Sequence, residues 1–103
     1  MIQAIKEKFL KIQVKKKFLN ALEEEVEFAI SGSREYGSSK GLSNAGMNTV
    51  LPMIIQSAIA NTSQGLKEGI EKLQNNLDLS KSEMHALLDE AVKETMNKYF
   101  KSW

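Results

Sequence analysis

The chain has 103 residues, of which 42% are hydrophobic and 26% charged, and its formal net charge is +1. This composition predicts one ordered globular domain and argues against a generally basic nucleic-acid-binding protein. The absence of cysteine excludes disulfides, thiolate metal sites and cysteine nucleophiles, and fits a cytoplasmic protein.

Residues 2–30 carry apolar side chains at alternating steps of three and four, which is typical of an amphipathic helix. The row comprises Ile2, Ile5, Phe9, Ile12, Lys16, Leu19, Glu23, Val26 and Ile30. A second row widens the apolar face in the later half and comprises Phe18, Leu22, Val26 and Ala29. We expect one long helix, or two helices that bend near Asn20. Packing within the chain is favoured over a seam between two copies.

The charges of this helix are ordered against its dipole. Its first part contains the lysine cluster Lys15, Lys16 and Lys17, and its second part contains the acidic run Glu23, Glu24, Glu25 and Glu27. A helix dipole favours acids near the start and bases near the end. The reversed order therefore suggests that a charged partner, or a second copy of the helix, faces this segment.

Residues 31–48 contain four of the six glycines and five serines. Helix propensity is low in such a segment, so we expect a connection here, either a functional loop or a flexible link. A short extra helix within 41–48 is a further alternative.

The next predicted helix covers residues 49–77. Thr49 is a suitable N-cap and would place Pro52 in the first turn, where its missing N–H is tolerated. A row of small side chains follows at steps of four: Ser57, Asn61, Gly65 and Gly69. We interpret this row as a close crossing with another helix of the chain; a hinge or a groove for a partner is the alternative.

The clearest local motif precedes the helix predicted for residues 81–101. Ser80 and Glu83 have the spacing of a capping box, and Leu79 and Met84 have that of a hydrophobic staple. Acids come early in this helix and lysines late, as the dipole favours.

His85 is the only histidine, and Asp89 lies one turn further along the same predicted helix. Two such residues do not complete a zinc site, so we interpret His85 as a surface or packing residue. The glutamates of the acidic run point in several directions around a helix, which does not suit a catalytic carboxylate pair. We expect neither a cofactor nor a metal site.

Together these patterns predict an all-α bundle of three main helices. They favour a non-enzymatic protein-interaction module, either a homodimeric regulator or an inhibitor or immunity-type protein. The residues expected to bind the partner are Lys15, Lys16, Lys17, Glu23, Glu24, Glu25, Glu27 and the aromatic Trp103. The alternative is a nucleic-acid-binding regulator that contacts phosphates through Lys15, Lys16 and Lys17.

Overall fold

The computed structural model describes residues 2–73 and 79–101. Within these residues the chain forms three helices, α1 (Ile2–Ser39), α2 (Asn44–Glu71) and α3 (Lys81–Phe100), and every pair of helices is in contact. The predicted all-α class is confirmed, and α1 is one continuous helix rather than two. Its length gives the molecule its longest dimension of 58 Å.

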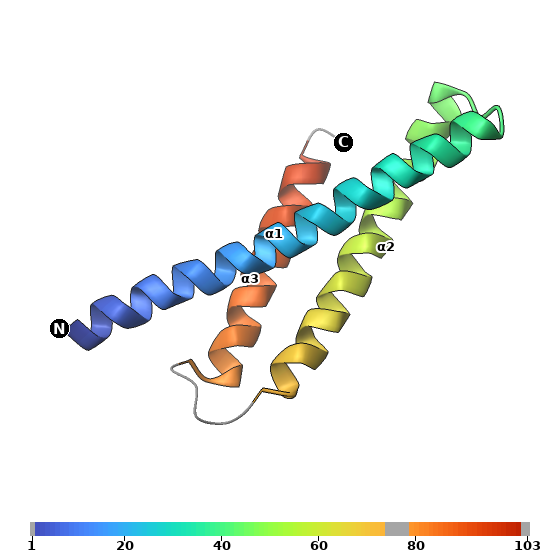
Figure 1. Ribbon diagram of the computed structural model, residues 1–103. Helices are drawn as coiled ribbons and strands as arrows, with labels where there is room; N and C mark the ends of the chain where they lie inside the picture. The colour runs from blue at the N-terminus through green and yellow to red at the C-terminus, as the bar shows by residue number, and fades with distance from the viewer. Residues whose placement is uncertain (1, 74–78, 102–103) are drawn as a thin grey trace.

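The helix α1 lies across the pair formed by α2 and α3 (Figure 1). The chain reverses at residues 40–43, so α2 runs back beneath α1, and α3 then runs in the same general direction as α1. The amino-terminal end of α1 extends beyond the two helices that it crosses. One face of α1 is thus directed at α2 and α3, and the opposite face, which we call the outer face, is directed away from them.

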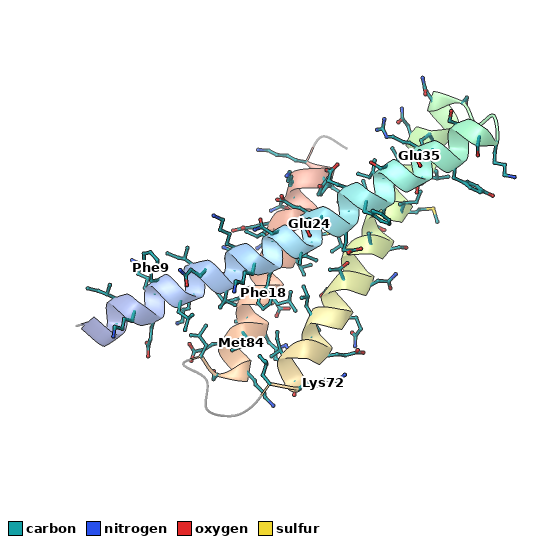
Figure 2. The ribbon with its side chains drawn as sticks, in the orientation of Figure 1. Phe9, Phe18, Glu24, Glu35, Lys72 and Met84 are labelled. Carbon is teal, nitrogen blue, oxygen red and sulfur yellow. The ribbon has the colours of Figure 1, made fainter. Side chains whose placement is uncertain are left out.

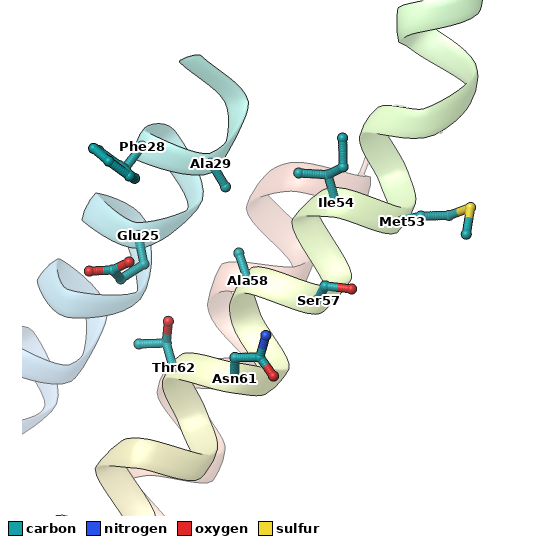
Figure 3. Close-up of a pocket in the computed structure, with 9 residues that line it drawn as sticks. All are labelled: Glu25, Phe28, Ala29, Met53, Ile54, Ser57, Ala58, Asn61 and Thr62. Atoms are coloured by element: carbon teal, nitrogen blue, oxygen red, sulfur yellow. The ribbon is translucent and has the colours of Figure 1, made fainter. Parts of the chain in front are cut away.

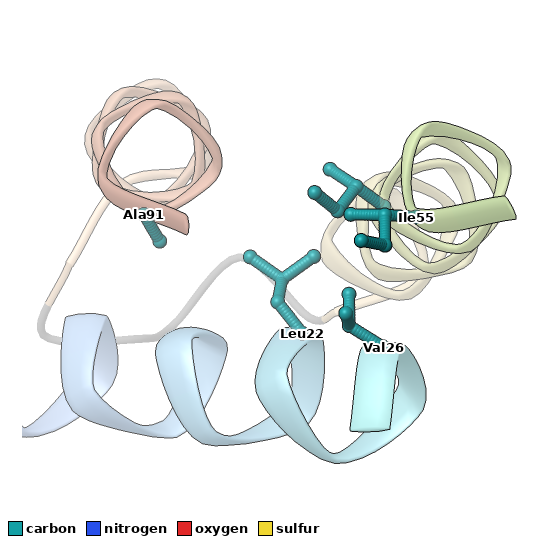
Figure 4. Packing of buried hydrophobic residues seen from close by; sticks show 5 residues of the cluster. Leu22, Val26, Ile55 and Ala91 are labelled. Carbon is teal, nitrogen blue, oxygen red and sulfur yellow. The ribbon is translucent and has the colours of Figure 1, made fainter. Parts of the chain in front are cut away.

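The core lies where α1 crosses the other two helices. Leu22 and Val26 of α1 point into the space between α2 and α3, where they meet Ile55 of α2 and Ala91 of α3 (Figure 4). A second cluster joins the end of α2 to the start of α3 and consists of Ile70, Leu79, Met84, Leu87 and Leu88. Leu10, Val14 and Phe18 of α1 pack against this second cluster.

The residues that α1 contributes to the core are four apart, from Leu10 through Val14, Phe18 and Leu22 to Val26. Such a row winds gradually around a helix, and it is the ridge that packs when two helices cross at an angle. The prediction of the second apolar row is therefore confirmed for Leu22 and Val26. The first row is correct only in its later half, because its early members Ile5, Phe9 and Ile12 are exposed.

The predicted connection at residues 31–48 is wrong for most of its length. Residues 31–39 continue α1, residues 44–48 begin α2, and no separate short helix forms. The glycines here serve close packing rather than helix breaking. Gly37 is buried, and a side chain on it would collide with Met47 of α2, while one on Gly46 would come within 2.9 Å of Leu42. Only Gly41, with φ 76°, takes the left-handed conformation that a glycine adopts easily.

The start of α2 also differs from the prediction. The N-cap is Ser43, whose hydroxyl oxygen accepts the Gly46 N–H at 3.1 Å. Thr49 lies inside the helix and donates its hydroxyl to the Ala45 carbonyl, so Pro52 is interior rather than in the first turn. The helix ends at Glu71, and the predicted end near Leu77 lies outside the described residues.

The motif before α3 is confirmed. The Glu83 N–H donates to the Ser80 hydroxyl oxygen at 3.1 Å, and this hydroxyl lies 3.2 Å from the Glu83 carboxylate. Leu79 and Met84 are both buried, as a hydrophobic staple requires. The chain thus enters α3 at a fixed position against the end of α2.

Candidate interaction surface

The charges of α1 are paired in part with those of α3. In the early half of α1, Lys11 lies 3.4 Å from Glu83, and Lys15 lies 2.6 Å from Glu94 and 3.6 Å from Glu90. Because α3 runs in the same direction as α1 and has acids early and bases late, the reversed order on α1 is its complement.

The later half of α1 shows the same relationship with the signs exchanged. Glu23 lies 3.3 Å from Lys98, and Glu27 accepts a hydrogen bond of 2.6 Å from the Tyr99 hydroxyl. The charged partner that the sequence suggested for α1 is, for these residues, a helix of the same chain.

Two pKa shifts follow from these contacts. The hydrogen bond to Glu94 raises the pKa of the Lys15 ammonium, which keeps this lysine charged. Burial, followed by the hydrogen bond to Glu27, raises the pKa of the Tyr99 hydroxyl. Both groups therefore stay protonated at neutral pH and act as donors that hold α3 against α1.

The predicted partner-binding residues fall into three groups. Lys15, Glu23 and Glu27 are engaged by α3. A second group is exposed and makes no ion pair within the described residues: Lys16, Lys17, Glu24 and Glu25. Trp103 lies outside the described residues. Only the second group has charge that is available to another molecule.

A shallow groove of about 530 Å³ runs between α1 and α2. Ala29 of α1 and Ala58 of α2 point toward one another across it, and Phe28 and Met53 lie at its outer margins (Figure 3). Phe28 is 77% exposed and Met53 69%, so both large apolar side chains face solvent. The acidic side chain of Glu25 also lines the groove.

Sequence reasoning missed Phe28 and Met53 as surface residues. The signal was present in the sequence, because Phe28 belongs to neither apolar row of α1 and stands directly after Glu27. A large apolar residue outside the core-facing rows of an amphipathic helix is expected to be exposed.

A second exposed apolar group lies near the amino-terminal end of α1, where Phe9 is labelled in Figure 2. Ile5, Phe9 and Ile12 are exposed by 66%, 63% and 60%. They were expected in the core, and they are exposed because this part of α1 packs through Leu10 and Val14 on another side. The side chain of Ile2 lies outside the described part of the chain.

The row of small residues on α2 does not form the predicted internal crossing. Ser57, Asn61, Gly65 and Gly69 are all exposed, and no atom lies within 4 Å of the position that a side chain on either glycine would take. Ser57 and Asn61 line the groove instead. The alternative interpretation of this row, a groove for a partner, stays a prediction.

His85 pairs with a residue of another helix. Its Nε2 atom lies 2.6 Å from Oε1 of Glu71, which joins the start of α3 to the end of α2 and lowers the pKa of the Glu71 carboxyl. The residue is thus a partly exposed surface histidine, as predicted, although it pairs with Glu71 and not with Asp89. Among the described residues, no group of three or more histidines and acids has the arrangement of a metal site.

Comparisons with protein-family models, with curated proteins and with solved structures found no match. None of the helices in the described part of the chain combines the length and the apolar character that a membrane crossing requires. The candidate surface is therefore argued from its own residues.

Proposed function

We propose that this chain is a non-enzymatic protein-interaction module. It binds through the outer face of α1 and the groove between α1 and α2. The observation that carries this proposal is the exposure of Phe28 and Met53 on either side of an apolar groove. Large exposed apolar residues grouped beside polar ones are typical of interaction sites, because water contact with them is unfavourable until a partner covers them.

The unpaired charges around the groove supply specificity. Glu24 and Glu25 lie next to Phe28 on α1 and have no ion-pair partner within the described residues. An apolar surface with an acidic border suits an amphipathic helix that carries basic residues beside its apolar face. We therefore expect the partner to present a basic, apolar helical segment.

The test is capture of binding proteins from a lysate of the source cells on the immobilised chain. Wild type is compared with the double variant Phe28→Asp, Met53→Asp and with the control Leu73→Asp, an exposed apolar residue just after α2. Circular dichroism verifies that all three fold. We expect at least one protein to be retained by wild type and the control and lost by the double variant. If no protein depends on Phe28 and Met53, the proposal is wrong.

A second candidate function is binding of nucleic acid. Lys16 and Lys17 are exposed and make no ion pair within the described residues, which leaves them able to contact phosphates. Fluorescence titration with duplex and single-stranded DNA at low salt tests this function. Binding that weakens steeply as salt rises, and that is lost in Lys16→Glu, Lys17→Glu, would favour nucleic acid, and absence of binding at low salt removes this candidate.

A further inference from the structure

We propose that the partner of the outer face of α1 is a second copy of this chain. The two α1 helices pair in antiparallel orientation, and a two-fold axis passes beside Asn20. This proposal rests on the proposed function, since it identifies the occupant of the same surface.

The outer face of α1 is exposed along its length. Residues eleven positions apart are about three helical turns apart and lie nearly in line. Two such rows occupy this face: Phe9, Asn20 and Ser31 form one, and Gln13, Glu24 and Glu35 form the other. All six residues are exposed, and α2 and α3 lie on the opposite side of α1 (Figure 1). A second helix therefore reaches this face without obstruction from the chain's own fold.

The charges on this face are self-complementary only in antiparallel orientation. Lys16 and Lys17 precede Asn20 by about one turn, and Glu24 follows it by about one turn. With Asn20 of both copies at the axis, the lysines of each copy face Glu24 of the other. A parallel pair would instead place lysine beside lysine and glutamate beside glutamate, which is unfavourable.

The apolar side chains of this face also meet in the antiparallel register. Phe9 of one copy lies beside Ser31 and Phe28 of the other. At that place α1 has a shallow depression of about 500 Å³ whose lining includes Glu24, Phe28 and Ser31. Phe9 and Phe28 are each more than 60% exposed in the single chain, so their contact removes apolar surface from water at both ends of the pair.

The contacts with α3 do not compete with this pairing. Lys15, Glu23 and Glu27 are already engaged by α3, whereas the pairing uses Lys16, Lys17 and Glu24, which have no ion pair within the described residues. A polar asparagine between the paired helices fixes their register, because every shifted register separates the two amides.

Cysteine cross-linking tests the orientation, since the natural chain has no cysteine. A disulfide needs the two Cα atoms within about 7 Å, which an antiparallel pair provides only near its axis. We expect Asn20→Cys to form a covalent dimer under mild oxidation, whereas Ser31→Cys alone stays monomeric in a denaturing gel. A mixture of Ser31→Cys with Phe9→Cys should cross-link. Cross-linking of Ser31→Cys alone would indicate a parallel pair and overturn the proposal.

Charge exchange tests the contacts at low salt by light scattering after size exclusion. Wild type should have the mass of two chains and should dissociate as salt rises. The variants Lys16→Glu, Lys17→Glu and, separately, Glu24→Lys, Glu25→Lys should each weaken the dimer by about tenfold or more. A mixture of the two variants should restore it, because opposite charges then face each other on both sides of the axis.

A wild-type chain that is monomeric at low salt overturns the proposal. The proposed function is judged separately, because lysate proteins that depend on Phe28 and Met53 would still be captured by a monomer. A dimer unaffected by either charge variant would also overturn the proposal, since the pairing depends on these charges. The Leu73→Asp variant is the matched control and should dimerise like wild type.

Discussion

Tyr99, at the end of α3, donates a hydrogen bond of 2.6 Å to Glu27 of α1, although the two residues are 72 positions apart in the chain. One turn back on α1, Glu23 pairs with Lys98 of the same α3 terminus. The acidic half of α1 thus receives its hydrogen-bond donor and its counter-charge from the end of α3. Stability of the bundle therefore depends on a contact between distant parts of the sequence.

Replacing Tyr99 with phenylalanine removes the donor to Glu27 and keeps the ring. We expect a loss of about 1 kcal/mol in the free energy of unfolding, the ordinary contribution of one hydrogen bond. Urea denaturation followed by circular dichroism measures it. Glu27→Gln and the double variant complete a thermodynamic cycle, and additive effects of the two changes would contradict a direct contact.

Leu22→Ala and Phe28→Ala should have very different effects although both residues lie on α1. Leu22 is fully buried between α2 and α3, so its truncation should cost about 2–5 kcal/mol. Phe28 is largely exposed, and its truncation should change stability by less than about 0.5 kcal/mol. Thermal unfolding of both variants checks this, and equal destabilisation would show that Phe28 is part of the core.

Alanine substitutions of two glycines should have opposite signs. Gly41 has φ 76°, where a Cβ atom is strained, so Gly41→Ala should destabilise the chain by about 1 kcal/mol. Gly65 is exposed within α2 and has open space around it, so Gly65→Ala should stabilise the chain by up to about 1 kcal/mol. Denaturant midpoints of the two variants are compared with wild type, and a shift in the same direction for both would refute the assignment.

The Glu83 carboxyl should make stability depend on pH in the acid range. Its pKa lies below the usual 4.5 because of the hydrogen bond from the Ser80 hydroxyl and the nearby Lys11. A lowered pKa in the folded state means that the ionised form favours folding. This contribution is fully present above pH 4.5 and is lost as pH falls through the folded-state pKa.

Thermal melts of wild type and Glu83→Gln at pH 7 and at pH 3 measure this contribution. We expect Glu83→Gln to lower the melting temperature at pH 7 and to have a smaller effect at pH 3. A difference that is the same at both pH values would mean that the charge of Glu83 does not stabilise α3.

The sequence predicted those features that depend on neighbouring residues. Ser80, Glu83, Leu79 and Met84 were assigned correctly, because a capping box and a staple are complete within one turn. The all-α class followed from apolar periodicity in the same way. Local signals of this kind are independent of how the helices are arranged.

Features that depend on the arrangement of the helices were not predictable. Gly37 and Gly46 indicated a loop, but they lie in helices because Met47 and Leu42 occupy the space that their side chains would need. Phe9 belonged to a regular apolar row, yet α1 crosses its neighbours at an angle and leaves it exposed. Neither a close approach nor a crossing angle is visible in the periodicity of one segment.

The separation of α1 from α3 in the sequence also has a consequence during synthesis. A ribosome releases α1 and α2 before α3 exists, so Lys15, Glu23 and Glu27 emerge without Glu94, Lys98 and Tyr99. For that interval the nascent chain displays all the charge of α1, together with the core residues that α3 will later cover. Neighbouring nascent chains on one messenger are then exposed to mispairing, and translation speed through the last third of the message sets how long this exposure lasts.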